Sequence, residues 1–258
     1  IATIKKSPWP VAICKLMDHP ATVHRRVPMD AIVVKDSDQK GQILGLHVFT
    51  GLFTSSTYSC RTSEIPMARQ KVRATIERAG FAKGGHDYKA LEHILEKLPR
   101  DELFQVTADE LYQLSLGILR LQKKHQVGLF AHQDPFGQYM SCLVYVPRDK
   151  YNARFRERCG HVIEEFLKGK LTNFFTTLDD SPLARLLFTV RLKNAAEAKF
   201  DYTVLETKVV DLAREWDEKL KHYLVNALNK SEALALSARY GRAFPQGAID
   251  SRWLTIQF

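Results

Sequence analysis

The stretch PFGQYMSCLVYVPRDKYN, residues 135–152, constrains the architecture more than any other segment of the chain. It opens on a turn signal, Pro135-Phe136-Gly137, and continues with eight almost uninterrupted apolar residues from Tyr139 to Val146. An apolar run of this length, closed by Pro147, indicates a strand buried on both faces and therefore central in its sheet. The segment PRDKYN then leads from this strand into a helix.

The segments on either side of this strand complete an antiparallel sheet. VGLFAHQD (127–134) pairs with it, a helix of about 152–168 carries one apolar stripe, and LTNFFTTL (171–178) and LARLLFTVRL (183–192) form two further strands. A capping-box spacing, Thr203 with Glu206, then opens one long helix that reaches about Leu228. Residues 139–228 thus read β-α-β-β-α, which is the α+β class with a ferredoxin-like sheet covered by helices on one face.

The chain before residue 127 adds a second set of strands and a group of linking helices. The sequence predicts a strand at residues 11–17 and a hairpin of two strands over 31–53. It then predicts a helix from Pro66 to Gly80 and a second from Tyr88 to Leu98 with Asp87 as its cap. A third helix starts at the capping box of Thr107 and Glu110. We therefore divide the chain into a β-rich part of one module (1–64), a helical segment (65–125), a β-α-β-β-α module (126–230) and a C-terminal helix and tail (231–258), in which WLTIQF resembles a strand.

The composition narrows the class of protein. The 45% apolar and 26% charged content is that of a soluble globular chain, and no apolar run is long enough to span a membrane. The four cysteines show no paired spacing, which favours reduced thiols and a cytoplasmic location. The net charge of +9 is spread among acidic residues, which favours a solvated face or an acidic neighbouring subunit over nucleic acid. Because the chain starts at Ile1, we expect it to be a piece of a longer polypeptide.

Motifs for catalysis or cofactor binding are missing from the sequence. It contains no glycine-rich phosphate loop, no GxSxG and no HExxH, and the adjacent carboxylates Glu164-Glu165 and Asp179-Asp180 lie on a helix and in a turn. His86 and His93 are seven residues apart, about two turns of a helix, so the two rings lie too far apart along the axis to ligate one ion. We therefore assign no catalytic, cofactor-binding or metal-ligating residue in this segment.

Two binding functions remain open. The loop VPRDKYN offers Arg148 for the carboxylate and Asp149 for the amine of a small zwitterion, beside a helix start at Asn152. The alternative reading is that Asp149 or Asn152 only caps the helix while Arg148 stays in solvent. An RNA-binding module is disfavoured, because LTNFFTTL lacks the basic-glycine start of an RNA-binding strand and one of its two phenylalanines is expected to face the core.

Several stretches together resemble one family, the large bacterial NAD-specific glutamate dehydrogenases. They are GLFTSSTY (51–58), IPMARQKVRATIERAGF (65–81), KALEHILEKLPRDELFQ (89–105), PFGQYMSCLVYVPRDKYN and YGRAFP (240–245), in the order in which that family has them. The resemblance covers about residues 10–245 and leaves out the tail from Gly247. It points to the long region that precedes the dehydrogenase core, which the family builds from ACT-like domains and linking helices. The resemblance therefore implies that residues 1–64 are the β-rich part of an ACT/PAS-like module and that residues 126–230 are an ACT-like module.

The resemblance implies a non-catalytic role within a catalytic parent. The parent would convert L-glutamate, NAD and water to 2-oxoglutarate, ammonium and NADH, as a cytoplasmic homo-oligomer. This segment would hold no cofactor and would contact the catalytic part of the same chain, sensing an amino-acid effector at Arg148, Asp149 and Asn152. The structural alternative is an oligomerisation module that packs through a seam of Leu205, Trp216 and Tyr223.

Overall fold

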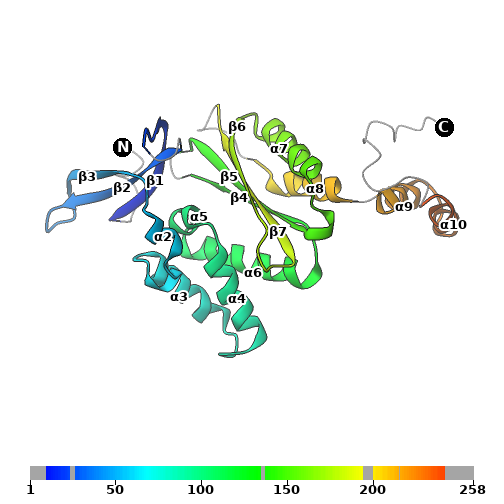
Figure 1. The fold of residues 1–258 in the computed structure, drawn as a ribbon, viewed down its shortest axis with the longest axis horizontal. Coiled ribbons are helices and arrows are strands. Elements are labelled where there is room, and N and C mark those ends of the chain that lie inside the picture. Colours follow the sequence, from blue (N-terminus) through cyan, green and yellow to red (C-terminus); the bar gives the residue numbers. More distant parts are fainter. Residues whose placement is uncertain (1–9, 24–26, 135–136, 194–199, 215, 242–258) are drawn as a thin grey trace.

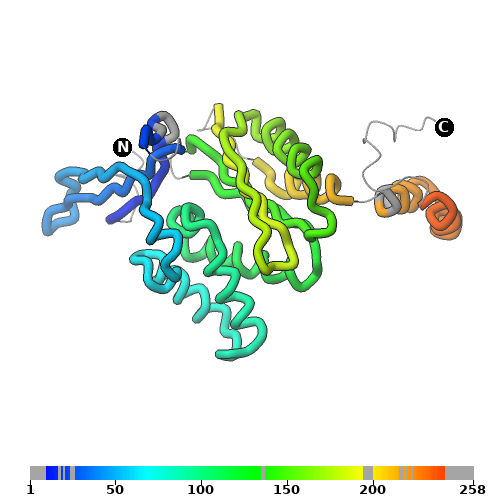
Figure 2. The backbone as a smooth tube through the Cα atoms, viewed as in Figure 1, coloured from blue at the N-terminus to red at the C-terminus, as the bar shows by residue number. Residues whose placement is uncertain are grey.

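The structure, a computed structural model, describes residues 10–23, 27–134, 137–193, 200–214 and 216–241. Figure 1 shows the blue strands of one sheet at the left, the green and yellow strands of a second sheet at the right, and a block of helices below them. The tube in Figure 2 runs from the first sheet down through these helices and back up into the second sheet. The expected α+β class is confirmed.

The first sheet is an antiparallel meander whose strands lie in the order β1-β2-β3. Its strands are β1 (Val11–Pro20), β2 (Pro28–Ser37) and β3 (Ile43–Gly51). The predicted hairpin between β2 and β3 is confirmed, because Asp38 Oδ1 accepts the backbone N–H groups of Lys40 and Gln42 at 2.9 and 2.8 Å, and Gly41 adopts a positive φ of 80°.

The helical block follows the first sheet. Its elements are α2 (Ser55–Ser59), η1 (Thr62–Glu64), α3 (Ala68–Ala79), α4 (His86–Lys97), α5 (Arg100–Gln105) and α6 (Ala108–Lys124). The capping box of α6 is confirmed, since Thr107 Oγ1 accepts the backbone N–H of Glu110 at 3.2 Å and Glu110 Oε2 accepts that of Thr107 at 2.7 Å. The predicted cap Asp87 is wrong: α4 begins at His86, two residues earlier than predicted, and Asp87 instead forms an ion pair with Lys123 of α6 at 2.7 Å.

The second sheet has the strand order β4-β5-β7-β6, with every neighbouring pair antiparallel. Its elements are β4 (Gly128–Gln133), β5 (Tyr139–Pro147), α7 (Ala153–Leu167), β6 (Lys170–Thr177) and β7 (Leu183–Arg191), with η2 (Arg148–Lys150) before α7. The predicted β-α-β-β-α unit supplies β5, β6 and β7, and the fourth strand of the sheet, β4, precedes this unit in the chain and pairs with β5. The expectation that Phe174 or Phe175 faces the core is wrong, because both are exposed on the edge strand β6.

Strand β5 is buried along its whole length, as its apolar run predicts. Met140, Cys142, Val144 and Val146 belong to one core with α7 and with α8 (Tyr202–Ala213), which follows the sheet. The alternate residues Leu143 and Tyr145 belong to a second core with α4 and α6. The linking helices thus cover the face of the sheet that α7 and α8 leave free.

Helix α6 and strand β4 approach so closely that side chains would not fit at two positions. A β-carbon at Gly117 of α6 would lie 2.6 Å from the Phe130 ring, and one at Gly128 of β4 would lie 2.5 Å from the Leu121 side chain. A side chain at either position would therefore require the Phe130 ring or the Leu121 side chain to shift. The helix and the strand therefore form one tightly packed corner.

The chain after the sheet differs from the prediction of one long helix. It forms α8 (Tyr202–Ala213), α9 (Trp216–Ala227) and α10 (Lys230–Tyr240), because Arg214 takes an extended conformation that ends α8. The predicted capping box is also wrong: Asp201 caps α8, and Glu206 instead accepts the N–H of Leu129 on the edge of β4 at 3.2 Å. The Trp216 side chain and the WLTIQF tail lie outside the described residues.

Within the described ranges, no helix is both long and apolar enough to cross a membrane.

Candidate functional site

The loop predicted from sequence lies between β5 and α7. Asn152 caps α7, since its Oδ1 accepts the N–H of Phe155 at 2.8 Å, and the N–H of Arg148 donates to the Pro182 carbonyl at 3.3 Å. Arg148 and Asp149 are both exposed on η2, while Lys150 pairs with Glu218 of α9 at 3.0 Å. The structure thus gives Asn152 a capping role and leaves the Arg148 and Asp149 side chains open to a ligand from solvent.

A second group of polar residues lies where the first sheet, the helical block and the second sheet meet. We call it the polar junction. Its members are Lys15 of β1, Asp30 of β2, Asp101 and Glu102 of α5, Glu110 of α6, His132 of β4 and Ser141 of β5. Most of these side chains are buried or half-buried, so each charge depends on its partners.

Lys15 connects the first sheet to the helical block. Its Nζ lies 2.7 Å from Asp30 Oδ1 in the same sheet and 3.2 Å from Asp101 Oδ2 on α5. Burial alone would lower the pKa of Lys15, but the two carboxylates outweigh it and raise that pKa. The ammonium therefore stays charged and bridges two structural units.

Glu102 connects the helical block to the second sheet. Ser141 of the central strand β5 donates its hydroxyl to Glu102 Oε1, and both residues are buried. Burial raises the pKa of Glu102, although the Ser141 hydrogen bond and the nearby His132 oppose that effect. This carboxyl group is held in a site that disfavours its charged form.

His132 makes the other connection between the second sheet and the helices. Its Nδ1 lies 3.7 Å from Glu110 Oε1, and this contact, with the hydrogen bonds from Thr107, lowers the pKa of Glu110 to about 2. Burial would lower the pKa of His132, but Glu110 and Glu102 outweigh it and raise that pKa. Asp101 Oδ1 and His132 Nε2 are buried without a hydrogen bond to any described residue.

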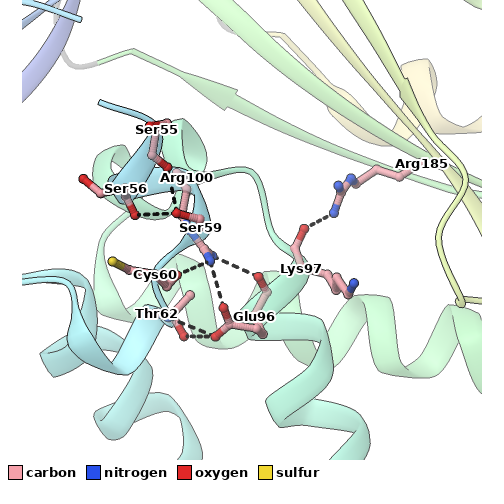
Figure 3. Close-up of polar contacts among 9 residues, drawn as sticks. All are labelled: Ser55, Ser56, Ser59, Cys60, Thr62, Glu96, Lys97, Arg100 and Arg185. Atoms are coloured by element: carbon pink, nitrogen blue, oxygen red, sulfur yellow. Dashed lines mark hydrogen bonds and ion pairs between the residues drawn. The ribbon is translucent and has the colours of Figure 1, made fainter. Parts of the chain in front are cut away.

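An arginine cluster fixes the chain where the first sheet passes into the helices (Figure 3). The buried Arg100 donates to the Cys60 carbonyl at 2.9 Å and to Glu96 Oε1 at 2.8 Å, and Glu96 Oε2 accepts both the N–H and the hydroxyl of Thr62 at 2.9 and 2.8 Å. Nearby, Arg185 of β7 donates to the Lys97 carbonyl. These bonds tie the segment before α3 to α4 and tie α4 to the second sheet.

The polar junction and the arginine cluster position structural units and hold no exposed nucleophile. Sequence reasoning missed both groups, because their members come from segments far apart in the chain. A signal was present in single residues: Lys15 interrupts the apolar strand VAICKLM, and Ser141 interrupts YMSCLVYV. A polar residue inside a buried strand requires a partner, but the sequence does not say which one.

Comparisons with known proteins match most of this architecture. The family described as "Glutamate dehydrogenase, helical motif 1" matches residues 65–124, and "Glutamate dehydrogenase, ACT2 domain" matches residues 128–217. Two relatives named NAD-specific glutamate dehydrogenase, from Halomonas elongata and Pseudomonas aeruginosa, are 37% and 35% identical over 88% and 89% of this chain. A third of the same name, from Mycobacterium tuberculosis, is 26% identical over 80% of it. The chain spans 14%, 14% and 13% of these relatives.

Proposed function

Because the chain belongs to the glutamate dehydrogenase family through its helical motif 1 and ACT2 domain, we propose that it is a regulatory and assembly segment of an NAD-dependent glutamate dehydrogenase. The parent enzyme would oxidise L-glutamate with NAD and water to 2-oxoglutarate, ammonium and NADH. In this proposal the segment carries no catalytic residue and binds no NAD.

The polar junction is the observation that supports a regulatory role. It joins the ACT2 sheet to helical motif 1 by charged and hydrogen-bonded contacts, Glu102 with Ser141 and Glu110 with His132. A change in position of the sheet would therefore alter the partners of buried charged groups, which is energetically costly. Regulation through this segment would act on that contact.

The effector part of the proposal rests on Arg148 and Asp149. Both are exposed beside the N-terminus of α7, where the positive end of the helix dipole favours a carboxylate. A thermal-shift screen of the common amino acids at millimolar concentration tests this role. We expect one amino acid to stabilise the chain and Arg148→Ala or Asp149→Ala to remove the effect, with Lys168→Ala as the control. No stabilisation by any amino acid would contradict it.

Catalytic inactivity of the segment is tested separately. We expect the isolated chain to form no NADH from L-glutamate and NAD, and measurable turnover would overturn the proposal.

The second candidate, a purely structural oligomerisation module, is favoured by the exposed aromatic residues of β6. It predicts self-association without any response to amino acids. RNA binding remains a weaker prediction from the net charge, and retention of an oligonucleotide at low salt that is lost as salt rises would support it.

A further inference from the structure

An open hollow of about 900 Å³ lies along α3, away from the polar junction and from the loop between β5 and α7. Figure 1 shows α3 below both sheets, where it packs against α4 and α6. The hollow follows α3 from Arg69 to Gly80, which is about 17 Å of helix, and continues past Lys83 to Tyr88 in the first turn of α4. It is therefore long enough to receive a helix of about three turns.

The floor of the hollow is apolar. Val72 is buried, and Ile76 and Phe81 are half-buried, because they pack on the core of the helical block with one side and line the hollow with the other. Tyr88 adds a half-buried aromatic ring. A β-carbon at Gly80 would meet no atom within 4 Å, so the backbone at the end of α3 is also open to the hollow. An apolar floor of this length is typical of a groove that receives an amphipathic helix.

The rim of the hollow is basic. Its charged residues are three cations, Arg69, Arg73 and Lys83, and one anion, Glu77. Arg73 lies 3.6 Å from Glu77, but the two side chains are 78% and 70% exposed, so this pair is weak. Arg69 and Lys83 form no ion pair within the part of the chain that the structure describes. An excess of exposed cations around an apolar floor favours an acidic partner.

The occupant of the hollow therefore needs acidic residues beside an apolar stripe. A second copy of this chain does not offer them: its exposed apolar helices, α9 and α10, together contain four basic and three acidic residues. In the proposed function the chain is one segment of a longer polypeptide, and it spans 14% of two of its relatives. Most of such a polypeptide lies outside this chain and can supply the partner helix.

We propose that the hollow along α3 binds an acidic amphipathic helix from the part of the parent polypeptide outside this chain. The apolar stripe of that helix packs on Ile76 and Phe81. Its acidic flanks pair with Arg69, Arg73 and Lys83. This inference rests on the proposed function, which places the chain in a longer polypeptide, and it gives helical motif 1 a docking role in assembly.

Fluorescence anisotropy with two designed peptides tests the chemistry of the site. The first is a fluorescein-labelled helical peptide of about 15 residues, with leucine at every third or fourth position and glutamate on both sides of that stripe, and the second has lysine in place of glutamate. We expect the glutamate peptide to bind the chain saturably and the lysine peptide to bind at least about tenfold more weakly. Absence of saturable binding, or equal affinity for the two peptides, would overturn the inference.

Charge reversal at the rim tests the location of the binding. Arg69→Glu combined with Arg73→Glu should raise the dissociation constant of the glutamate peptide at least about tenfold and lower that of the lysine peptide. Arg120→Glu, at an exposed position of α6, is the matched control and should change neither constant by more than about twofold. All three arginines are exposed, so the circular dichroism spectra should stay those of the wild type. An equal effect of the control would place the binding elsewhere and contradict the assignment.

Photo-crosslinking in the full-length parent tests the source of the helix. A photoreactive amino acid in place of the exposed Gln70, which lines the hollow, should crosslink to an acidic helical segment outside this chain. One in place of Gln113, exposed on α6, should not crosslink to that segment. A crosslink to a second copy of this chain, or none at all, would count against the proposal. Catalytic inactivity and stabilisation by amino acids have separate tests, so failure here is distinguishable from failure of the proposed function.

Discussion

Replacement of Lys15 by methionine should loosen the attachment of the first sheet to the helical block. Methionine keeps most of the length and apolar surface of the lysine stem, so the main loss is the ammonium. That loss leaves Asp30, whose side chain is 8% exposed, and Asp101, which is 29% exposed, without their cation. Removal of one partner from a fully buried ion pair costs about 3–5 kcal/mol.

Partial exposure reduces this cost. Asp101 can turn toward water, so we expect Lys15→Met to lower the free energy of unfolding by about 2–3 kcal/mol at pH 7. Two further variants divide the effect. Adding Asp30→Asn to Lys15→Met should recover about half of the loss, because the most buried carboxylate is then neutral, whereas Asp101→Asn alone should cost about 1 kcal/mol or less.

Urea denaturation followed by circular dichroism measures these differences. Lys40→Met, in the exposed turn between β2 and β3, is the control for the loss of a lysine charge and should change the free energy by less than about 0.5 kcal/mol. If Lys15→Met is as stable as Lys40→Met, or if the double variant is no more stable than Lys15→Met, the polar junction does not hold the two units together as described.

Three further predictions concern the helical block and its contact with the second sheet. Lys71 donates to three backbone carbonyls at the C-terminal end of α5, at 2.6 to 3.2 Å. Lys71→Met should therefore lower the free energy of unfolding by about 2 kcal/mol in urea denaturation. The control Lys89→Met, at an exposed position, should have a negligible effect. Met67 precedes α3 with φ 65° and ψ −51°, a strained conformation for a residue with a side chain. Met67→Gly should therefore raise the free energy of unfolding by about 1 kcal/mol, seen as a higher melting temperature. A lower melting temperature would contradict the assignment of strain. The pKa of Glu110 is lowered from 4.5 to about 2, so its charge stabilises the fold above pH 4.5, and that contribution is lost as pH falls toward 2. The pKa of His132 is raised from 6.5, so its charge stabilises the fold below pH 6.5, and that contribution is lost as pH rises through the raised pKa. His132→Gln should therefore flatten the dependence of stability on pH above 6.5, and an unchanged profile would refute the pairing.

The local signals in the sequence predicted those elements whose environment is set by their own residues. The apolar run of β5 needs cover on both faces, and the Thr107–Glu110 capping box satisfies the first turn of α6 from within the same four residues. The prediction failed where a distant partner decides the outcome. Glu206 has the spacing of a capping box with Thr203, but the unpaired N–H of Leu129 on the sheet edge competes for its carboxylate.

The long helix expected after Thr203 failed for a related reason. An apolar repeat continues through the segment, but Arg214 takes an extended conformation and pairs with Asp211 at 2.7 Å, so α8 ends where it leaves the sheet. The polar junction could not be predicted at all, because Lys15, Glu102 and Ser141 come from three distant segments, with 126 residues between the positions of Lys15 and Ser141, and meet only through the packing of three units. The candidate effector residues Arg148, Asp149 and Asn152 were located correctly between a strand and a helix, and their binding role stays a prediction.

The tight corner at Gly117 and Gly128 has a mechanical consequence. Only residues 125–127 separate α6 from β4, and at the two glycines the Phe130 ring and the Leu121 side chain approach the backbone closely. Helical motif 1 and the ACT2 sheet are therefore connected by a short and closely packed junction, so we expect a rotation of α6 to shift β4 and, through the paired strands, the edge at β6. A movement that begins in the helices would reach the opposite side of the sheet as a change of position and would not be absorbed at the domain boundary.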